Sequence, residues 1–322
     1  MGYGSIGKRH VKNLLNHTDS QIIIYTKRQD LDFKTKRVIV TNSFEHSLSQ
    51  NPNVGFICNE TSKHIPIAIK LAKAGLDLFL DKPLSDSMKG ISTLNKIVKE
   101  KKLVTQMGCQ LRFHVCIKKI RQLLAQKKIG KIISVQVENG SYLPDWHPHE
   151  DYRKGYAAKK NLGGGVVLTQ IHDIDYLYWF FGNPKSVFSI NGKFSELSIS
   201  VEDYSASLLQ FKNKITVELH QDFFQGPEYR GCKLKGTNGV ISWNSINNEI
   251  KFYNNRTKKW KIIMKLKNFE KNQMYIDEIK HFLKCVKNRR KTINILDDGI
   301  NTMNIAIAIK KSGRYKKTIK TD

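Results

Sequence analysis

The sequence contains no hydrophobic run long enough to cross a membrane. Its longest apolar stretches, IIIY at 22–25 and YLYWFFG at 176–182, are far shorter than the roughly 20 residues that a membrane-spanning helix needs. The N-terminus also lacks the apolar segment that marks a secretory signal peptide. These absences predict a cytoplasmic protein with no membrane partner.

Cysteine is scarce and follows no pattern. The five cysteines are odd in number, and no two of them form a C-x-x-C motif. A disulfide framework or a zinc site needs cysteines at regular spacing, so we expect reduced thiols. His147, His149, Glu150 and Asp151 gather in one loop, but ligands this close in sequence rarely complete a metal site without distant partners, and we predict no metal. The cysteines are Cys58, Cys109, Cys116, Cys232 and Cys285.

Acidic residues are few. The chain has 28 Asp and Glu against 55 Lys and Arg, which gives a formal net charge of +27. A nucleic-acid-binding surface would gather its basic residues into a stripe with aromatics between them, whereas here they are spread along the chain and only 310–320 is dense. This favours a solvated surface of biased composition. One alternative is a general preference for anionic small substrates, which the field of a basic protein would help to attract. Polyanion binding is the other alternative; we predict no nucleic-acid partner.

The first 120 residues alternate apolar strands with helices. The spacing of apolar residues over 61–75 predicts a helix that stops at Gly75. Alternation of this kind is typical of a doubly wound parallel sheet. The fold class is therefore α/β, with a Rossmann-type domain over 1–120. Strands are predicted at 21–26, 37–41, 53–59, 76–83 and 103–110.

A glycine-rich turn stands at the beginning of the chain. Gly2, Gly4 and Gly7 fit G-x-G-x-x-G, with Ser5 and Ile6 between the last two glycines. This turn joins a strand to a helix and holds the pyrophosphate of a dinucleotide. No strand precedes the turn here, although in a doubly wound sheet that strand is central and buried. We therefore expect the first strand upstream of the turn, within roughly ten residues.

After about residue 120 the pattern changes to strands separated by Gly and Asn turns. Segments such as KIISVQVENG, YSASLLQFKNKITVELHQDF and VISWNSINNEIKFYNN predict one large, mostly antiparallel open sheet. Two closing helices are expected at 273–287 and 297–312. We assign 121–322 to a second domain of the α+β class.

The strand at 21–26 leads into Thr26, Lys27 and Arg28. A carboxylate commonly stands here to bind the ribose 2′-hydroxyl of NAD, whereas a neutral residue beside cations suits the 2′-phosphate of NADP. NADP is therefore favoured over NAD. The alternative is that Lys27 and Arg28 are two more surface cations of a lysine-rich chain.

Asp81, Lys82 and Pro83 end a strand at the carboxyl edge of the sheet, where open α/β folds bind ligands. A lysine held there can hydrogen-bond a substrate hydroxyl or stabilise alkoxide charge. Taken alone, the segment is typical of a surface turn.

Three glycines precede an expected helix within 161–182. Thr169, His172 and Asp175 recur at i, i+3 and i+6, so a continuous helix would place them on one face. A histidine beside a nicotinamide can remove a hydroxyl proton as hydride leaves the carbon. Taken singly, His172 fits a satisfied core histidine at least as well.

Together and in this order, these segments resemble the glucose–fructose oxidoreductase and inositol dehydrogenase (Gfo/Idh/MocA) family over nearly the whole chain. The tract at 142–182 is especially similar to a branch associated with bacterial sugar and surface-polysaccharide metabolism. The resemblance implies NAD(P)-dependent oxidation or reduction of a sugar or polyol by a dimer or tetramer. The stretches that carry it are GYGSIGKRHVKNL, ICNETSKH (with Glu60 where proline is usual), DKP, GCQLRFH, the tract at 142–182 and DDGINTMNIAIAIKKS.

The resemblance also implies roles for single residues. Lys82 would touch both substrate and nicotinamide, and His172 would be the general acid/base. The cofactor is expected against Gly2, Gly4, Ser5, Ile6, Gly7, Thr26, Lys27, Arg28, Asn59, His64, Asp81 and Lys82. The substrate is expected against Arg112, Trp146, His147, Tyr152, Thr169 and Asp175. Trp146, His147, Tyr152 and Arg153 would stand on a loop over the substrate pocket, and plain packing of that loop is the alternative.

One departure from the family pattern concerns catalysis. The family places an aspartate four or three residues before the histidine, and this chain has Leu168 and Thr169 there. The role of that aspartate is either lost or passed to Thr169, Asp173 or Asp175. The alternative function is therefore a non-catalytic, dinucleotide-binding or sugar-sensing protein of the same fold.

Overall fold

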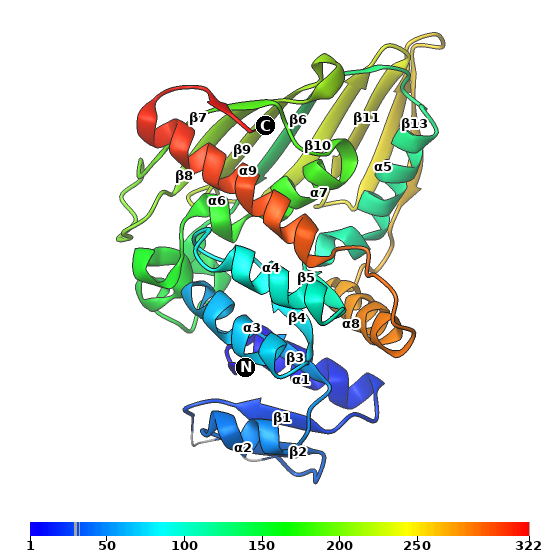
Figure 1. Ribbon diagram of the computed structural model, residues 1–322. Helices are drawn as coiled ribbons and strands as arrows, with labels where there is room; N and C mark the ends of the chain where they lie inside the picture. The colour runs from blue at the N-terminus through cyan, green and yellow to red at the C-terminus, as the bar shows by residue number, and fades with distance from the viewer. Residues whose placement is uncertain (29–30, 32, 322) are drawn as a thin grey trace. The chain divides into compact units, whose positions relative to one another are not determined.

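The computed structural model of the chain describes residues 1–28, 31 and 33–321 and is drawn in Figure 1. The chain forms two compact units, one made of residues 1–110 and 271–300, the other of 111–270 and the residues from 301 onward. The expected division had a single boundary at residue 120. The difference arises because helix α8 (Lys271–Lys287) returns to the first unit and contributes to its core.

The first unit has the parallel α/β arrangement that its sequence pattern predicted. Two strands pair in parallel as β1–β2, and three form a parallel sheet in the order β3–β4–β5. Their short runs of Ile, Val, Leu and Phe suit strands that are buried on both faces. The strands are β1 (Ile22–Tyr25), β2 (Val38–Thr41), β3 (Val54–Ile57), β4 (Asp77–Asp81) and β5 (Thr105–Gly108).

Helices pack on these strands through apolar stripes. Helix α1 buries Val11 and Leu14, while α8 brings Phe282 against Phe79 of β4. Gly75, with φ of +88°, follows the end of α3, as the stop signal predicted. Besides α8, the helices are α1 (Ser5–His17), α2 (Phe44–Ser49), α3 (His64–Lys73) and α4 (Ile91–Glu100), with a 3₁₀ turn at Thr61–Lys63.

The second unit is built on the large sheet that was expected. Among the described residues it has nine strands in the order β13-β12-β11-β10-β6-β9-β8-β7-β14. Neighbouring strands are antiparallel except for β6 and β9. The strands are β6 (Ile132–Gly140), β7 (Ser186–Gly192), β8 (Tyr204–Gln210), β9 (Thr216–Asp222), β10 (Tyr229–Gly236), β11 (Gly239–Asn244), β12 (Glu249–Asn254), β13 (Lys259–Lys265) and β14 (Ile319–Lys320).

Helices cover one face of this sheet (Figure 1). They are α5 (Val115–Ala125), α6 (Val166–Thr169), α7 (His172–Phe181) and the later part of α9 (Leu296–Tyr315), whose first residues belong to the first unit. Apolar side chains of strands β7 and β8 remain exposed, among them Phe188, Ile190 and Leu208.

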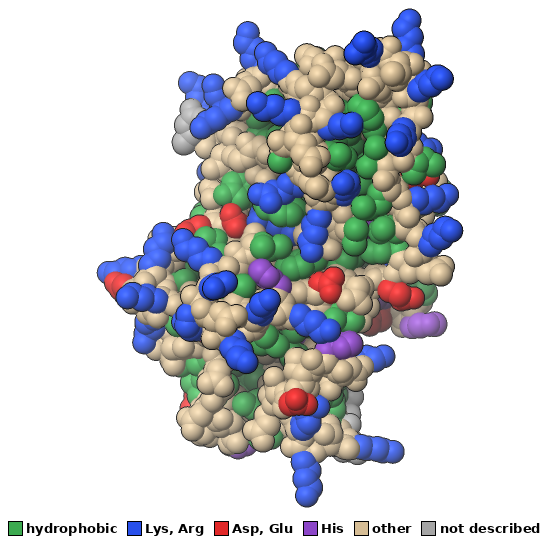
Figure 2. Space-filling view, turned by 90° about the vertical axis from the view of Figure 1, so that its right-hand side faces the viewer, with side chains coloured by type: hydrophobic (Ala, Val, Ile, Leu, Met, Phe, Trp, Pro, Cys, Tyr) green, Lys and Arg blue, Asp and Glu red, His purple; other side chains and the backbone are tan. Residues whose placement is uncertain are grey.

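Lysine and arginine side chains are scattered over the face drawn in Figure 2 and do not gather into one stripe. No helix of the described residues combines the length and the apolar character that a bilayer span requires.

Candidate functional site

The three glycines of the first turn have different surroundings. Gly2 has a φ of +89°, and a Cβ at this position would lie 2.9 Å from the backbone of Asn59. A Cβ at Gly7 would lie 2.6 Å from the carbonyl oxygen of Gly2. Because glycine has no Cβ, α1 can pack against the turn at this position. A Cβ at Gly4 would meet no heavy atom within 4 Å. The turn is therefore open at Gly4, where a ligand can approach the backbone closely.

The open side of this turn is the N-terminus of α1. Gly4 caps the helix without a side-chain hydrogen bond, and the first turn holds no acidic residue. The first helical hydrogen bond runs from the Lys8 N–H to the Gly4 carbonyl at 2.9 Å. The N–H groups of Ser5, Ile6 and Gly7 therefore come before the first hydrogen bond within the helix. Such N–H groups, together with the helix dipole, bind anions. These residues fit a dinucleotide pyrophosphate.

The residues expected to set cofactor preference follow β1. The Thr26 N–H donates to the Thr41 carbonyl at 3.0 Å, and Thr26 Oγ1 accepts from the Arg28 N–H at 3.2 Å. Lys27 and Arg28 are exposed. Burial raises the pKa of Tyr3, a residue of the glycine turn, and the nearby charge of Arg28 opposes that rise. Arg28 therefore lies near the glycine turn.

His64 joins the loops that follow β3 and β4. Its side chain is 1% exposed, with Nδ1 2.9 Å from the Pro83 carbonyl oxygen and Nε2 2.9 Å from that of Asn59. The imidazole thus holds together two loops at the carboxyl edge of the sheet. Because the Asn59 backbone also contacts Gly2, His64 fixes one wall of the glycine turn.

Lys82 follows the last residue of β4 at this same edge and is half-buried. Burial raises the pKa of the neighbouring Asp81 carboxyl, while Lys82, His64 and Arg9 act to lower it. Asp81 Oδ1 packs against Gly108 of β5, where a Cβ would lie 3.0 Å from this oxygen. The carboxyl edge of the sheet therefore presents a lysine beside a half-buried carboxyl group.

In the second unit, Arg112 and Asp175 form an ion pair. Arg112 Nε lies 2.8 Å from Asp175 Oδ2, and Nη2 lies 2.9 Å from Oδ1. Both side chains are 1% exposed. Thr302 Oγ1 contacts Asp175 Oδ1 at 3.5 Å, and the guanidinium lies 5.4 Å from the ring centre of Trp179. Arg112 and Asp175, both expected to contact substrate, thus contact each other and hold α7 in place.

The continuous helix expected within 161–182 is interrupted, which corrects the prediction of a single face. Helix α6 ends at Thr169 and α7 begins at His172. Strand β9 is the cause: Gln170 Nε2 donates to the Asp222 carbonyl, and Gln221 Nε2 donates to the Gln170 carbonyl, each at 2.9 Å. The turn therefore places Thr169 and His172 on separate helices. Both side chains are buried.

The carboxylate of Asp173, next to His172, is hydrogen-bonded and ion-paired to residues other than His172. Asn139 Nδ2 donates to Asp173 Oδ2 at 2.7 Å, and Arg230 Nη2 lies 3.4 Å from the same oxygen. Burial raises the pKa of this carboxyl, with Arg230 acting in the opposite direction. Of the carboxylates considered as substitutes for the family's aspartate, Asp173 is engaged by Asn139 and Arg230, and Asp175 by Arg112.

The loop residues come from a run of 3₁₀ turns between β6 and α6. Trp146 Nε1 donates to Ser141 Oγ at 3.0 Å, and the Tyr152 hydroxyl oxygen accepts from the Ser198 N–H at 3.2 Å. The side chain of His147 is exposed. The turns span Leu143–Trp146, Tyr152–Lys154, Tyr156–Ala158 and Lys160–Leu162.

One His–Asp pair was not found from the sequence. His220 Nε2 lies 2.7 Å from Asp222 Oδ2 on β9, and Asp222 Oδ1 accepts the N–H groups of Phe224 and Gln225 at 3.0 and 2.7 Å. The i, i+2 spacing within a predicted strand could have indicated it, because such residues share a face. Within the described part of the chain, no group of three or more His, Cys, Asp or Glu side chains could hold a metal ion.

These features define a dinucleotide-binding domain of the Rossmann class, joined to a unit with a large open sheet. Residues 1–109 match the model of the oxidoreductase family with an NAD-binding Rossmann fold, and residues 117–242 match that of the GFO/IDH/MocA C-terminal domain. The chain belongs to the Gfo/Idh/MocA family of oxidoreductases.

Relatives of known activity span the whole chain. Myo-inositol 2-dehydrogenase of Thermotoga maritima is 23% identical, covering 100% of this chain and 97% of the relative. Scyllo-inositol 2-dehydrogenase (NAD(+)) of Bacillus subtilis is 22% identical, covering 100% and 95%. The solved structure of levoglucosan dehydrogenase, in complex with NADH and levoglucosan, is 16% identical with a TM-score of 0.87 and covers 99% of this chain and 97% of that one. This structural likeness shows the shared fold.

Proposed function

We propose that the protein is an NAD(P)-dependent oxidoreductase that transfers a hydride between nicotinamide and a carbinol carbon of a sugar, sugar derivative or polyol. One observation supports the cofactor part of this proposal: a Cβ at Gly4 would meet no heavy atom within 4 Å, at the N-terminus of α1, where no side chain caps the helix. The substrate class rests on the family and on relatives named inositol dehydrogenases.

Lys82 and His172 are proposed as the catalytic residues. The nicotinamide, when bound, accepts or donates the hydride. Lys82 hydrogen-bonds the substrate oxygen and stabilises the negative charge that develops on it. His172 takes up the hydroxyl proton in oxidation and returns it in reduction. Arg112 and Asp175 position α7, and with it His172, through their buried ion pair.

NADP is proposed as the preferred cofactor. Support comes from the neutral Thr26 followed by two exposed cations, Lys27 and Arg28, of which Arg28 lies near Tyr3 of the glycine turn. A 2′-phosphate gains charge-assisted hydrogen bonds from such cations.

A dimer or tetramer is proposed through the exposed face of the large sheet. Phe188, Ile190 and Leu208 present exposed apolar surface on neighbouring strands, and contiguous apolar surface of this kind marks interaction sites. The partners otherwise expected are small molecules. On the face drawn in Figure 2 the cations are scattered, and a nucleic-acid-binding surface would gather them into a stripe.

A non-catalytic, dinucleotide-binding or sugar-sensing role is the second candidate. It is favoured by Leu168 and Thr169 at the positions of the family's aspartate, and by the engagement of Asp173 and Asp175 with Arg230 and Arg112.

The two candidates are separated by binding and turnover measured on the same preparation. NADPH and NADH binding is followed by fluorescence titration, and turnover by nicotinamide absorbance on a panel of inositols, anhydrosugars and nucleotide sugars. We expect turnover that falls 10²–10⁴-fold in Lys82→Met and in His172→Asn, with cofactor affinity retained in His172→Asn. Cofactor binding without turnover on any panel member would support the sensor. Absence of binding would refute both candidates.

A further inference from the structure

Arg230 of β10 carries a mostly buried guanidinium with few partners. Its side chain is 20% exposed, and its Nε is buried without a hydrogen-bond partner among the described residues. The guanidinium contacts the carboxylate of Asp173, with 3.4 Å between Nη2 and Oδ2. A charge-assisted hydrogen bond is shorter, roughly 2.7–2.9 Å. Because a charge that leaves water without strong hydrogen bonds is costly, this guanidinium has the capacity for a further acceptor.

Arg112 shows the opposite situation in the same unit. Its Nε and Nη2 lie 2.8 and 2.9 Å from the two carboxylate oxygens of Asp175, and its side chain is 1% exposed. The two arginines thus contact carboxylates that stand two residues apart on α7, but only Arg112 makes a bidentate pair. Arg112 is closed to a ligand, whereas Arg230 keeps an exposed part and donors beyond its contact with Asp173.

The groups around Arg230 compensate its charge only in part. Asn139 Nδ2 donates to the same oxygen of Asp173 at 2.7 Å, and burial raises the pKa of this carboxyl although the charge of Arg230 acts to lower it. A raised pKa favours the neutral carboxyl group. Burial also lowers the pKa of His114 to about 4, and the charge of Arg230 acts in the same direction. These surroundings suit a negatively charged ligand.

Arg230 stands beside the first turn of α7. Asn139 of β6 is its partner across the two strands. Asp173, which contacts both side chains, directly follows His172, the first residue of α7. Arg230 therefore contacts the residue next to the proposed acid/base. A substrate held at His172 would bring one of its substituents near the guanidinium.

We propose that Arg230 is a specificity-determining residue that binds a negatively charged substituent of the substrate, a carboxylate or a phosphate on the sugar, sugar derivative or polyol. The inference rests on the proposed function, because it places the substrate at His172. A guanidinium binds either group through two parallel N–H···O bonds. The formal net charge of +27 acts in the same direction, since the field of a basic protein raises the local concentration of anions.

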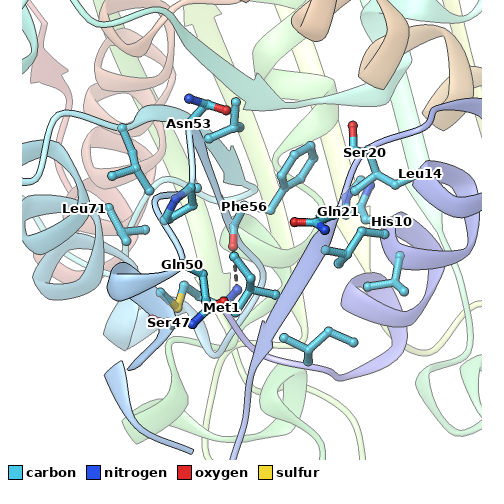
Figure 3. A pocket seen from close by; sticks show the side chains of 18 of the residues that line it. Met1, His10, Leu14, Ser20, Gln21, Ser47, Gln50, Asn53, Phe56 and Leu71 are labelled. Carbon is cyan, nitrogen blue, oxygen red and sulfur yellow. Dashed lines mark hydrogen bonds between the residues drawn. The ribbon is translucent and has the colours of Figure 1, made fainter. Parts of the chain in front are cut away.

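The cavity of the first unit offers no such site. Its volume is about 320 Å³, and its lining includes Leu14, Phe56 and Leu71, which Figure 3 labels. No lysine or arginine is among the described residues that line it. A carboxylate or phosphate would lose its hydration there without gaining a cationic side chain, so this cavity does not compete with Arg230 for an anionic group.

The test measures affinity for matched acidic and neutral compounds. The full chain, with NADPH present, is titrated calorimetrically with glucose, galactose and myo-inositol, with the phosphate of each, and with the uronates of the two hexoses. Arg230→Gln removes the cation. Arg230→Gln combined with Asp173→Asn removes both charges of the pair, and this double variant replaces the single one if the latter does not fold. Arg256→Gln, in the exposed turn between β12 and β13, is the matched control.

We expect at least one acidic compound to bind the parent chain about tenfold or more tightly than its neutral counterpart, the worth of one charge-assisted contact. Arg230→Gln, or the double variant, should bring this ratio close to one, and Arg256→Gln should leave it unchanged. A preference for the uronates identifies a carboxylate, and a preference for the phosphates identifies a phosphate.

Three results would overturn the proposal. The first is equal affinity of the parent chain for each acidic compound and its neutral counterpart, or no binding of any acidic compound. The second is a preference for the acidic compound that survives in Arg230→Gln. The third is a fall of both affinities by the same factor in that variant, which marks a structural role.

Turnover of the same compounds, followed by nicotinamide absorbance, separates this inference from the proposed function. For an acidic substrate, Arg230→Gln should raise KM more than it lowers kcat. Acid-selective binding that Arg230→Gln abolishes, without turnover of any compound, would support the inference and count against the enzymatic function. Turnover of the neutral compounds with no preference for the acidic ones would do the reverse.

Discussion

The guanidinium of Arg112 and the carboxylate of Asp175 meet through two parallel contacts, Nε to Oδ2 at 2.8 Å and Nη2 to Oδ1 at 2.9 Å. The pair links the segment that leads into α5 with α7, the helix that begins at His172. Each charge is buried with its partner, so the loss of one leaves the other uncompensated.

This pair predicts a non-additive effect on stability. Arg112→Met and Asp175→Leu should each lower the free energy of unfolding by about 3–5 kcal/mol, whereas the double variant that combines these two substitutions should lose less than the sum of the two single losses. Urea unfolding followed by tryptophan fluorescence measures all of them. Arg153→Ala, which breaks the exposed pair with Asp151, is the matched control and should leave the midpoint unchanged. A double variant that loses the full sum of the two single losses would contradict the coupling.

The glycines of the first turn should separate cofactor binding from stability. Gly4→Ala places its Cβ in open space, so it should weaken NADH and NADPH binding at least tenfold while costing under about 1 kcal/mol of stability as a cap change. Gly7→Ala meets the Gly2 carbonyl oxygen at 2.6 Å and should cost about 1–3 kcal/mol through overpacking. Fluorescence titration and thermal melting are run on both variants. Unchanged affinity in Gly4→Ala would show that no pyrophosphate approaches there.

Cofactor preference should depend on Arg28. Arg28→Ala removes a cation near the glycine turn and should lower the ratio of NADPH to NADH affinity by about tenfold, the worth of one charge-assisted contact. Lys101→Ala, an exposed lysine after α4, is the control and should leave the ratio unchanged. A drop in both affinities by the same factor would mean that Arg28 does not recognise the 2′-phosphate.

His10 should make the first unit sensitive to acid. Its side chain is 2% exposed, and neither ring nitrogen has a hydrogen-bond partner among the described residues. Burial lowers the pKa of His10 to about 3, with Arg9 and the N-terminal amino group contributing. The unfolded chain binds a proton near pH 6.5 and the folded chain does not, so stability falls as pH drops from about 6.5 toward 3.

His10→Phe keeps the aromatic packing against Phe56 and Phe79 and removes the proton site. Its stability should match that of the parent chain near pH 7.5 and exceed it by about 2–3 kcal/mol at pH 4.5. Urea unfolding at both pH values measures the difference. The same advantage at both values would assign the effect to packing alone.

Local patterns in the sequence were sufficient for the strands of the first unit, for the helix that ends before Gly75 and for the glycine turn. The apolar run before Thr26 became β1, and the stop at Gly75 followed α3, because these signals act over a few residues. The position of Lys82 directly after a strand was also predicted, because the end of that strand is likewise marked by neighbouring residues. The large, mostly antiparallel sheet was also predicted from the sequence, since its strands are separated by Gly and Asn turns.

The tertiary structure decided what depends on residues distant in the chain. Arg112 and Asp175 are 63 positions apart, and neither segment alone shows that they pair. The break after Thr169 comes from β9, whose Gln221 bonds to Gln170 from 51 positions away. Helix α8 joins the first unit because Phe282 fits against Phe79. Periodicity and turn chemistry therefore determined the elements, whereas burial and the pairing of polar groups across the fold determined which side chains meet.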